Sequence, residues 1–138
     1  MKKIFLDTNI LIDYIDNRDG ADDAEKIFAL GFSGEAKLFA SSLTFANIAY
    51  ILRSRPQDDI YNALGQLVSL VEILSLDKDH VMSSIAQPAP DFEDMLQYQC
   101  AKSAYCDFII TNDRRHYEFS TIPHLSSAAF VERMENLI

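Results

Sequence analysis

Short apolar runs alternate along this chain with stretches in which apolar residues recur at helical spacing. Three such runs cover residues 3–6, 37–40 and 108–110, and each has the length of a buried strand. Between them, apolar residues return every three or four positions, which is the pattern of one face of a helix. Strands that alternate with helices are typical of a mainly parallel sheet covered by helices, so this pattern predicts an α/β fold.

The same pattern predicts two further strands and seven helices. The strands are expected at 71–76 and near Leu125. The helices are expected from Thr8 or Asn9 to Ile15, at 24–30, from a cap at Ser42 or Thr44 to Leu52, at 60–68, from a cap at Asp77 or Asp79 to Ile85, at 91–104 and at 130–134. A loop is expected between Asp113 and Pro123. Since no linker, repeat or low-complexity tract interrupts these elements, residues 1–138 are expected to form a single domain.

Acidic residues outnumber basic ones, 21 to 12, and give a formal charge of −9. A protein that holds nucleic acid by electrostatics alone would be basic. The excess acid therefore either keeps the protein soluble or crowds a site that only a cation can neutralise. Charge alone does not separate these two interpretations.

The sequence carries no sign of a membrane or secretory protein. No segment approaches the roughly 20 apolar residues that span a bilayer, and the start lacks the features of a signal peptide. A cytoplasmic protein is expected. Cys100 and Cys106 are accordingly expected to be buried, reduced thiols.

Two aspartates directly follow predicted strands. Asp7 comes after the first strand, and Asp113 comes just after the strand that begins at Phe108. Ligands of open parallel sheets bind outside the carboxyl ends of the strands, so the two carboxylates meet there if the strands are neighbours. Asp94 lies in the first turn of the helix that leads to the later strand. Asp91 lies three residues earlier, on nearly the same helical face.

Carboxylates brought together repel unless they are protonated or bound to a cation. Oxygen ligands without clusters of His or Cys favour Mg²⁺ or Mn²⁺, and such an ion can promote phosphodiester hydrolysis. Each acid also has a structural interpretation. Asp7 and Asp91 could cap helices, Asp94 could interact with a helix dipole, and Asp113 could belong to a turn.

Four segments together resemble the motifs of PIN domains. They are Ile4-Phe5-Leu6-Asp7-Thr8-Asn9-Ile10-Leu11-Ile12, Ser41-Ser42-Leu43-Thr44-Phe45-Ala46-Asn47, Asp94, and Asp107-Phe108-Ile109-Ile110-Thr111-Asn112-Asp113. Their order and spacing agree over nearly the whole chain. The chain resembles VapC-type toxins, the nuclease half of bacterial toxin–antitoxin pairs. The resemblance implies a PIN-like three-layer fold, in which helices flank a central, mainly parallel sheet.

The resemblance also implies a function and roles for single residues. It implies an endoribonuclease that needs Mg²⁺ or Mn²⁺ and hydrolyses RNA phosphodiesters with a metal-activated water. The metal-ligand and catalytic residues are then Asp7, Asp94 and Asp113, while Asn9 and Thr111 orient ligands or phosphate. A small antitoxin that covers the site and a homodimer are further implications.

Basic residues near the predicted site are candidates to contact the RNA backbone. Arg114 and Arg115 are the strongest of them because they directly follow Asp113. Three others are Arg53, Arg55 and Lys102. Each could equally be a solvated surface charge.

One position departs from the family pattern. Family members usually have a glutamate where this chain has Asn47. An amide oxygen can coordinate a metal, but it brings no charge and cannot act as a general base. The sequence therefore allows two interpretations. The chain is either an active ribonuclease or a catalytically degenerate PIN module that binds RNA or a protein without cleavage. Asp91 is a candidate to supply the missing charge.

Other chemistry finds less support in the sequence. A phosphatase with an aspartyl nucleophile would need a second acid two residues after Asp7, where this chain has Asn9. The histidines are not spaced as metal ligands, and no Ser/His/Asp arrangement is legible from their order. They are His80, His116 and His124. We expect them at the surface or in loops.

Overall fold

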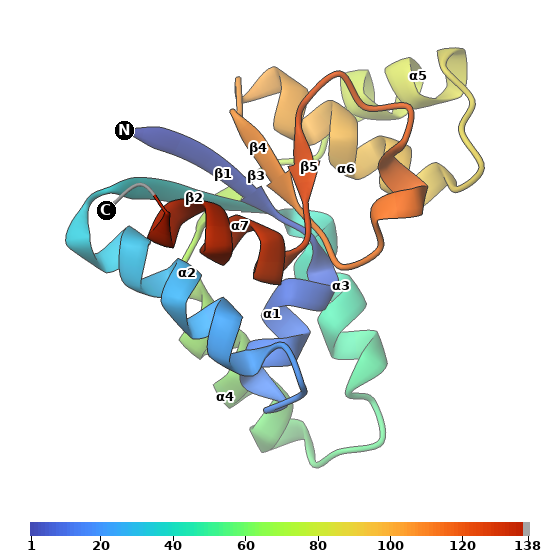
Figure 1. Cartoon of the computed structure of the whole chain (residues 1–138). Coiled ribbons are helices and arrows are strands. Elements are labelled where there is room, and N and C mark those ends of the chain that lie inside the picture. The colour runs from blue at the N-terminus through green and yellow to red at the C-terminus, as the bar shows by residue number, and fades with distance from the viewer. Residues whose placement is uncertain (137–138) are drawn as a thin grey trace.

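The computed structural model describes residues 1–136 as a three-layer α/β arrangement (Figure 1). The central sheet has five strands in the order β3-β2-β1-β4-β5, and every adjacent pair is parallel. The strands are β1 (Lys2–Leu6), β2 (Ala36–Ser41), β3 (Glu72–Leu74), β4 (Phe108–Ile110) and β5 (His124–Leu125). The sequence-based prediction of a central, mainly parallel sheet flanked by helices is confirmed.

Within residues 1–136, seven α-helices connect and cover these strands. They are α1 (Thr8–Ile15), α2 (Ala21–Ser33), α3 (Ser42–Ile51), α4 (Gln57–Val68), α5 (Lys78–Ala86), α6 (Phe92–Ser103) and α7 (Ser127–Glu135). α2 and α4 begin three residues before their apolar pattern, because their first turns are acidic and polar. Acids in a first turn interact favourably with the helix dipole. Part of the expected loop after β4 is a short 3-10 helix, η1 (Arg114–Tyr117).

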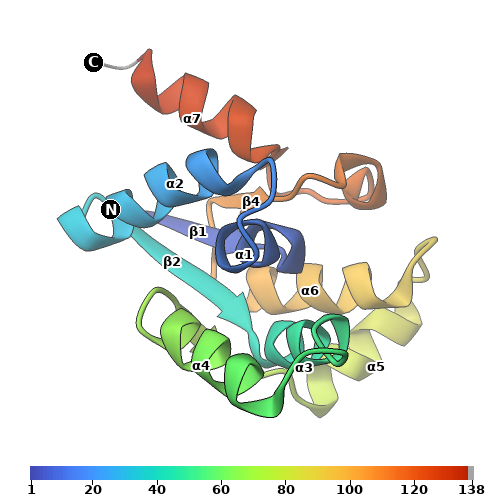
Figure 2. The ribbon, with the colours of Figure 1, turned by 90° about the horizontal axis from the view of Figure 1, so that it is seen from below.

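Alternating side chains of β1 build two hydrophobic cores, one on each face of the sheet. Ile4 and Leu6 join the core that α1, α2, α4 and α7 complete. Phe5 points the other way and packs with residues of α6 and η1. Figure 1 shows α1, α2 and α4 on one side of the strands and α6 on the other, and Figure 2 shows α7 beside α2. Strand positions that are buried on both faces in this way need apolar residues, and Ile4, Phe5 and Leu6 supply them in β1.

The pairing of β1 with β4 decides where the candidate site lies. Ile4 pairs with Phe108 and Leu6 pairs with Ile110, and the backbone N–H of Asp7 donates to the carbonyl of Ile110 over 3.0 Å. From β1 the chain builds outward to β2 and β3 on one side, and later to β4 and β5 on the other. Ligands of open α/β sheets bind where the strand order reverses in this way.

Side-chain caps fix the starts of the helices at this edge. Asp7 accepts a hydrogen bond from the N–H of Thr8 at the start of α1, and Asp91 accepts one from Asp94 at the start of α6. The predicted caps of α3, Ser42 or Thr44, are wrong. Ser41, the last residue of β2, caps α3 instead, so that helix begins one residue after the strand ends.

A buried network of polar side chains ties the middle of α6 to the starts of α1 and α3. The Gln97 amide on α6 donates to the Thr44 hydroxyl over 2.9 Å, and its carbonyl accepts from the Ser41 hydroxyl. Thr44 in turn lies 3.1 Å from the hydroxyl of Thr8 on α1. Because buried polar groups are costly to leave unpaired, this network fixes how α6 is rotated against α1 and α3.

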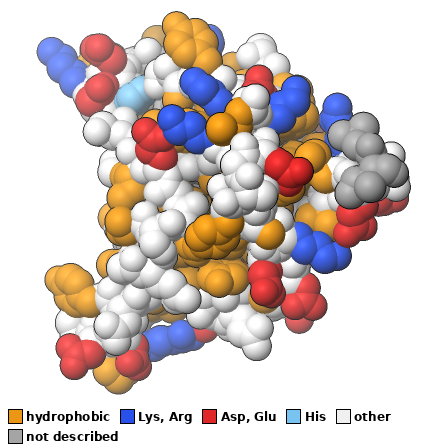
Figure 3. Space-filling model, turned by 90° about the vertical axis from the view of Figure 1, so that its left-hand side faces the viewer, with side chains coloured by type: hydrophobic (Ala, Val, Ile, Leu, Met, Phe, Trp, Pro, Cys, Tyr) orange, Lys and Arg blue, Asp and Glu red, His pale blue; other side chains and the backbone are white. Residues whose placement is uncertain are grey.

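The face shown in Figure 3 lies at the side where the chain begins, away from the ends of the strands discussed above. Basic and acidic side chains are interspersed there, with apolar side chains between them (Figure 3). Lys37 and Glu72, at the starts of β2 and β3, form an ion pair of 3.0 Å. The acidic excess of the chain is therefore not gathered on this face.

Other expectations concern the cysteines and the membrane. Cys100 and Cys106 are both free and buried, as predicted. Burial raises the pKa of the Cys100 thiol to about 11 and that of Cys106 to about 12. Within residues 1–136, the helices are too short or too polar to cross a membrane.

The buried network gives a test of the packing. Gln97→Leu keeps the volume of the side chain but leaves the hydroxyls of Ser41 and Thr44 without their partner. We expect it to lower the free energy of unfolding by about 1–3 kcal/mol, measured by urea denaturation. Gln99→Leu is the matched control, because the Gln99 amide makes only contacts of 3.5 Å. An equal loss in both variants would contradict a structural role for the network.

Candidate active site

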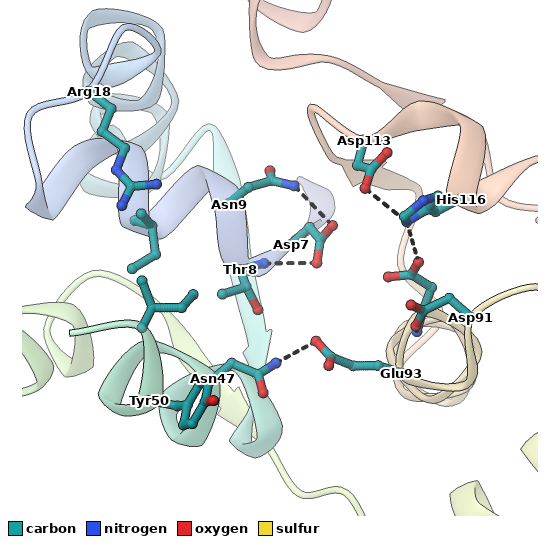
Figure 4. A pocket seen from close by; sticks show the side chains of 13 residues that line it. Asp7, Thr8, Asn9, Arg18, Asn47, Tyr50, Asp91, Glu93, Asp113 and His116 are labelled. Atoms are coloured by element: carbon teal, nitrogen blue, oxygen red, sulfur yellow. Dashed lines mark hydrogen bonds and ion pairs between the residues drawn. The ribbon is translucent and has the colours of Figure 1, made fainter. Parts of the chain in front are cut away.

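A cavity of about 410 Å³ opens at the carboxyl ends of β1 and β4. Side chains from α1, α3, α6 and the segment after β4 line it (Figure 4). The acids of this lining are Asp7, Asp91, Glu93, Asp94 and Asp113. Arg18, Tyr50 and Ile51 are among the residues at the other end. The cavity is therefore acidic at one end, while the other end is lined by the positively charged side chain of Arg18 and by apolar surface.

Asp7 is the most deeply buried of these acids, with 7% of its surface exposed. One carboxylate oxygen accepts from the N–H of Thr8 over 2.8 Å. The other accepts from the Thr111 hydroxyl over 2.8 Å and from the Asn9 amide over 3.3 Å. Burial raises the pKa of Asp7, and these hydrogen bonds act against that shift. The carboxylate is thus held in one orientation at the end of β1.

Thr111 links Asp7 to Asp113. Its buried hydroxyl donates to Asp7 and accepts from the backbone N–H of Asp113 over 3.0 Å. Asn9 stabilises the segment between Thr111 and Asp113, because its side-chain oxygen accepts from the N–H of Asn112 over 3.1 Å. Asn9 and Thr111 therefore contact both segments that carry the acids.

Asp94 faces Asp113 across His116. The Nδ1 atom of His116 lies 2.8 Å from a carboxylate oxygen of each aspartate, as Figure 4 shows for Asp113. Burial, followed by the charges of Asp7 and Asp91, raises the pKa of Asp94 to about 7. The Oδ2 atom of Asp94 is buried and makes no hydrogen bond of normal geometry. The three aspartates named from the sequence thus line one cavity.

His116 and Tyr117 were not named as site residues in the sequence analysis. His116 lies in η1 with its side chain 44% exposed. Tyr117 is fully buried, and burial and the charge of Asp7 raise the pKa of its hydroxyl. Both positions depend on the path of a segment that showed no periodic pattern, so the sequence carried no signal for them.

Glu93 is a further acid of the cavity that the sequence analysis missed. One of its carboxylate oxygens accepts from the Asn47 amide over 2.6 Å, so the pair spans the gap between α3 and α6 (Figure 4). Burial and the charges of Asp91 and Asp7 raise the pKa of Glu93. The available signal was an acid beside Asp94 in the first turn of the same helix.

The basic residues divide between the cavity and the surface. Arg18 lines the cavity and forms an ion pair of 2.9 Å with Asp16. Arg114 and Arg115 are exposed at the start of η1, and neither is part of the lining. The remaining candidates lie elsewhere: Arg53 stacks on Tyr50, Arg55 pairs with Asp16, and Lys102 lies in the last turn of α6.

The donor atoms suit a hard divalent cation. Carboxylate oxygens dominate the acidic end, and one of them, the buried Asp94 Oδ2, lies 2.8 Å from His116 Nδ1. Asp91, Asp94 and His116 also offer ligand atoms within 4.8 Å of one another. One oxygen of Asp91 is already engaged as the cap of α6 over 3.0 Å. Oxygen-rich sites of this kind favour Mg²⁺ or Mn²⁺.

A second cluster places Asp77, His80 and Ser103 together, although none of these residues was linked by the sequence analysis. His80 Nε2 lies 2.9 Å from the Ser103 hydroxyl, and the backbone N–H of Asp77 donates to His80 Nδ1 over 3.0 Å. Since Nδ1 accepts, a neutral His80 carries its proton on Nε2 and donates to Ser103. A histidine that activates a serine needs the opposite arrangement. His80 lies in the first turn of α5 with its side chain 12% exposed, and it completes the cap of that helix.

Comparisons with known proteins agree on one family. A family model described as a PIN domain matches residues 3–115. Ribonuclease VapC1 of Aquifex aeolicus (strain VF5) is 26% identical over 142 residues, which cover 99% of this chain and 98% of that protein.

Solved structures share the fold at low sequence identity. VapBC2 from Rickettsia felis, solved bound to a DNA fragment from their promoter, gives a TM-score of 0.71 at 16% identity and covers 90% of this chain and 97% of that one. VapC20 of Mycobacterium tuberculosis is described as a Sarcin-Ricin loop cleaving toxin. It gives a TM-score of 0.65 at 13% identity, and the match covers 83% of this chain and 95% of that one. At these identities the two likenesses support the fold alone.

The raised pKa of Asp94 predicts how stability depends on pH when no divalent metal is present. The unfolded chain loses the Asp94 proton near the ordinary value of 3.8, whereas the folded chain keeps it to about 7. Ionisation of Asp94 therefore lowers the stability as pH rises from about 4 to about 7. In EDTA, Asp94→Asn should melt higher than wild type, by roughly 2–6 °C at neutral pH, and the gain should vanish near pH 4.

Thermal melts across this pH range measure the effect. Asp22→Asn is the control, because Asp22 is exposed in the first turn of α2. A gain for Asp94→Asn that does not change with pH would contradict the electrostatic origin.

Proposed function

The chain belongs to the PIN-domain family, and on this premise we propose that it is an endoribonuclease that needs Mg²⁺ or Mn²⁺ and hydrolyses RNA phosphodiesters. The observation that carries the proposal is the convergence of Asp7, Asp94 and Asp113 on one cavity. The mutual repulsion and burial that raise the pKa of Asp94 to about 7 are what a bound divalent cation would offset.

Three aspartates hold the ion in this proposal, and their neighbours hold the aspartates. Asp7, Asp94 and Asp113 are the metal ligands. Asn9 and Thr111 keep Asp7 in its orientation through the hydrogen bonds described above. The bound ion supplies a Lewis acid for the scissile phosphate and lowers the pKa of the attacking water. The protein's part is to keep these carboxylates fixed and ionised around the reacting phosphate.

The opposite end of the cavity suits the rest of an RNA strand. Arg18 is placed to contact a phosphate next to the scissile one. Tyr50 is 65% exposed, and the Arg53 guanidinium stacks on it at 4.0 Å from the ring centre, so a base can stack on its free side. Arg114 and Arg115 are proposed to contact the backbone outside the cavity.

The toxin interpretation adds partners to this chemistry. We propose that residues 1–138 form a single domain that pairs with a small antitoxin covering the cavity, and that two copies form a homodimer. Support comes from the relative named Ribonuclease VapC1 and from the fold shared with VapBC2. Both partners would act in the cytoplasm.

A degenerate module that binds RNA or a protein without cleaving it is the second candidate. Asn47, in place of the usual glutamate, is the residue that favours it. Glu93 weakens this alternative, because it brings a carboxylate to the same gap. Titration of the protein with Mn²⁺ by calorimetry separates the two, since the degenerate module would take up no metal.

Removal of one proposed ligand should abolish cleavage. Asp7→Asn keeps the size of the side chain but removes its charge, so we expect the rate of RNA cleavage in Mg²⁺ to fall by at least about a hundredfold. Single-turnover assays on labelled RNA measure this, with EDTA as a further arm. Asp22→Asn, on the exposed start of α2, should cleave as wild type does. Equal rates for Asp7→Asn and wild type would contradict the mechanism.

The role of Arg18 has its own test. Arg18→Gln should raise KM for RNA by roughly tenfold and change kcat little, because the lost contact is equally present in ground and transition states. Lys78→Gln is the control for loss of one positive charge. Lys78 begins α5, beside the far end of α6 where His80 meets Ser103. An unchanged KM for Arg18→Gln would remove Arg18 from the proposed RNA path.

A further inference from the structure

Asn47 leaves the cavity without the glutamate that α3 usually carries in this family, yet a glutamate occupies the same gap from the other side. Glu93 lies in the first turn of α6, next to Asp94, and lines the cavity. Its Oε1 atom accepts from the Asn47 amide over 2.6 Å. The two side chains therefore meet where the usual glutamate of α3 would lie.

The surroundings of Glu93 are those of the acidic cluster. Burial, followed by the charges of Asp91 and Asp7, raises the pKa of its carboxyl group, and the Asn47 hydrogen bond acts against this shift. Glu93 is itself exposed to solvent, yet its carboxyl group still senses the charge of Asp7, which is almost fully buried. Glu93 thus shares the electrostatic field of the proposed metal ligands.

The fixed rotation of α6 gives Glu93 a defined direction. Gln97, one helical turn further along α6, is anchored to Ser41 and Thr44. Side chains four residues apart lie on the same face of a helix, so this anchor turns Glu93 towards α3. The Asn47 amide then holds one carboxylate oxygen, and within residues 1–136 the other makes no hydrogen bond.

We propose that Glu93 supplies the fourth carboxylate of the metal site, relocated from α3 to α6, and that Asn47 is a positioning residue that aims it. This inference rests on the proposed function of the cavity. Asn47 is then not a lost ligand, because its amide fixes Oε1 and leaves Oε2 directed at the metal or at a water that the metal holds. The carboxylate that α3 lacks at Asn47 is thus replaced by the carboxylate of Glu93 on α6.

Asp91 is the competing source of the missing charge. One of its oxygens already caps α6 by accepting from the N–H of Asp94, and loss of such a cap costs about 1 kcal/mol. Among the described residues 1–136, the hydrogen bond of the Asn47 amide goes to Glu93 and not to Asp91. Asp91 also lines the cavity, but its cap contact holds it at the start of α6, whereas Glu93 reaches across to α3.

Calorimetric titration of the full-length protein with Mn²⁺ tests the proposal without relying on activity. The variants are Glu93→Gln, Asp91→Ser and the double exchange Asn47→Glu with Glu93→Gln. Serine keeps the cap at position 91 while it removes the charge. The double exchange moves the carboxylate back to α3. Thermal melts in EDTA check that each variant is folded.

We expect Glu93→Gln to weaken Mn²⁺ binding by about tenfold or more, and the double exchange to restore it to within about threefold of wild type. Asp91→Ser should stay within about threefold of wild type. Unchanged binding by Glu93→Gln would overturn the proposal, as would a larger loss in Asp91→Ser. Wild type that takes up no Mn²⁺ would instead contradict the proposed function itself, so the two failures are distinguishable.

The positioning role of Asn47 needs a separate readout. Asn47→Ala removes the donor to Glu93. It should lower the affinity for Mn²⁺ to roughly a fifth of the wild-type value without lowering the melting temperature in EDTA. Asn47→Gln restores an amide and should recover most of the affinity. Equal Mn²⁺ affinities of Asn47→Ala and wild type would contradict a positioning role for Asn47.

Discussion

The parallel pairing of β1 with β4 is the constraint on which the rest of this structure depends. It places the ends of two strands, distant by about a hundred residues in sequence, at the same point of the sheet. Asp7 and Asp113 follow those strand ends, and the Thr111 hydroxyl joins them through one buried contact to each. Any slip of this register would separate the two carboxylates and leave Asp7 without its strongest donor.

The repulsion between several acids in one cavity opposes folding, and hydrogen bonds from neighbouring residues offset part of it. Hydrogen bonds from Thr8, Asn9 and Thr111 stabilise the charge of Asp7. Asp94 has no comparable set of donors, and burial raises its pKa to about 7. The rigid polar network around Gln97 prevents α6 from turning its acids away towards solvent. A site that is strained in this sense is prepared for a cation, because binding relieves the repulsion that folding has imposed.

Sequence reasoning identified what depends on the ends of regular elements and missed what depends on rotation and loop path. Asp7 and Asp113 were placed together because each follows an apolar run, and Asp94 because a helix begins there. Glu93 was missed, since its direction is set by contacts of Gln97 that no local pattern reveals. His116 was missed because a short 3-10 helix, and not a loop, carries it back to the aspartates. The cap of α3 was misplaced by one residue because Ser41 ends a strand and caps a helix at once.

The central claim is that these carboxylates form one divalent-metal site. A crystal of the protein soaked in Mn²⁺ and measured for anomalous scattering tests it most directly. The account predicts a peak within about 2.5 Å of carboxylate oxygens from Asp7, Asp94 and Asp113, with Glu93 directed at the same ion or at its water. Anomalous density confined to the outer surface, with the four side chains unchanged, would contradict it.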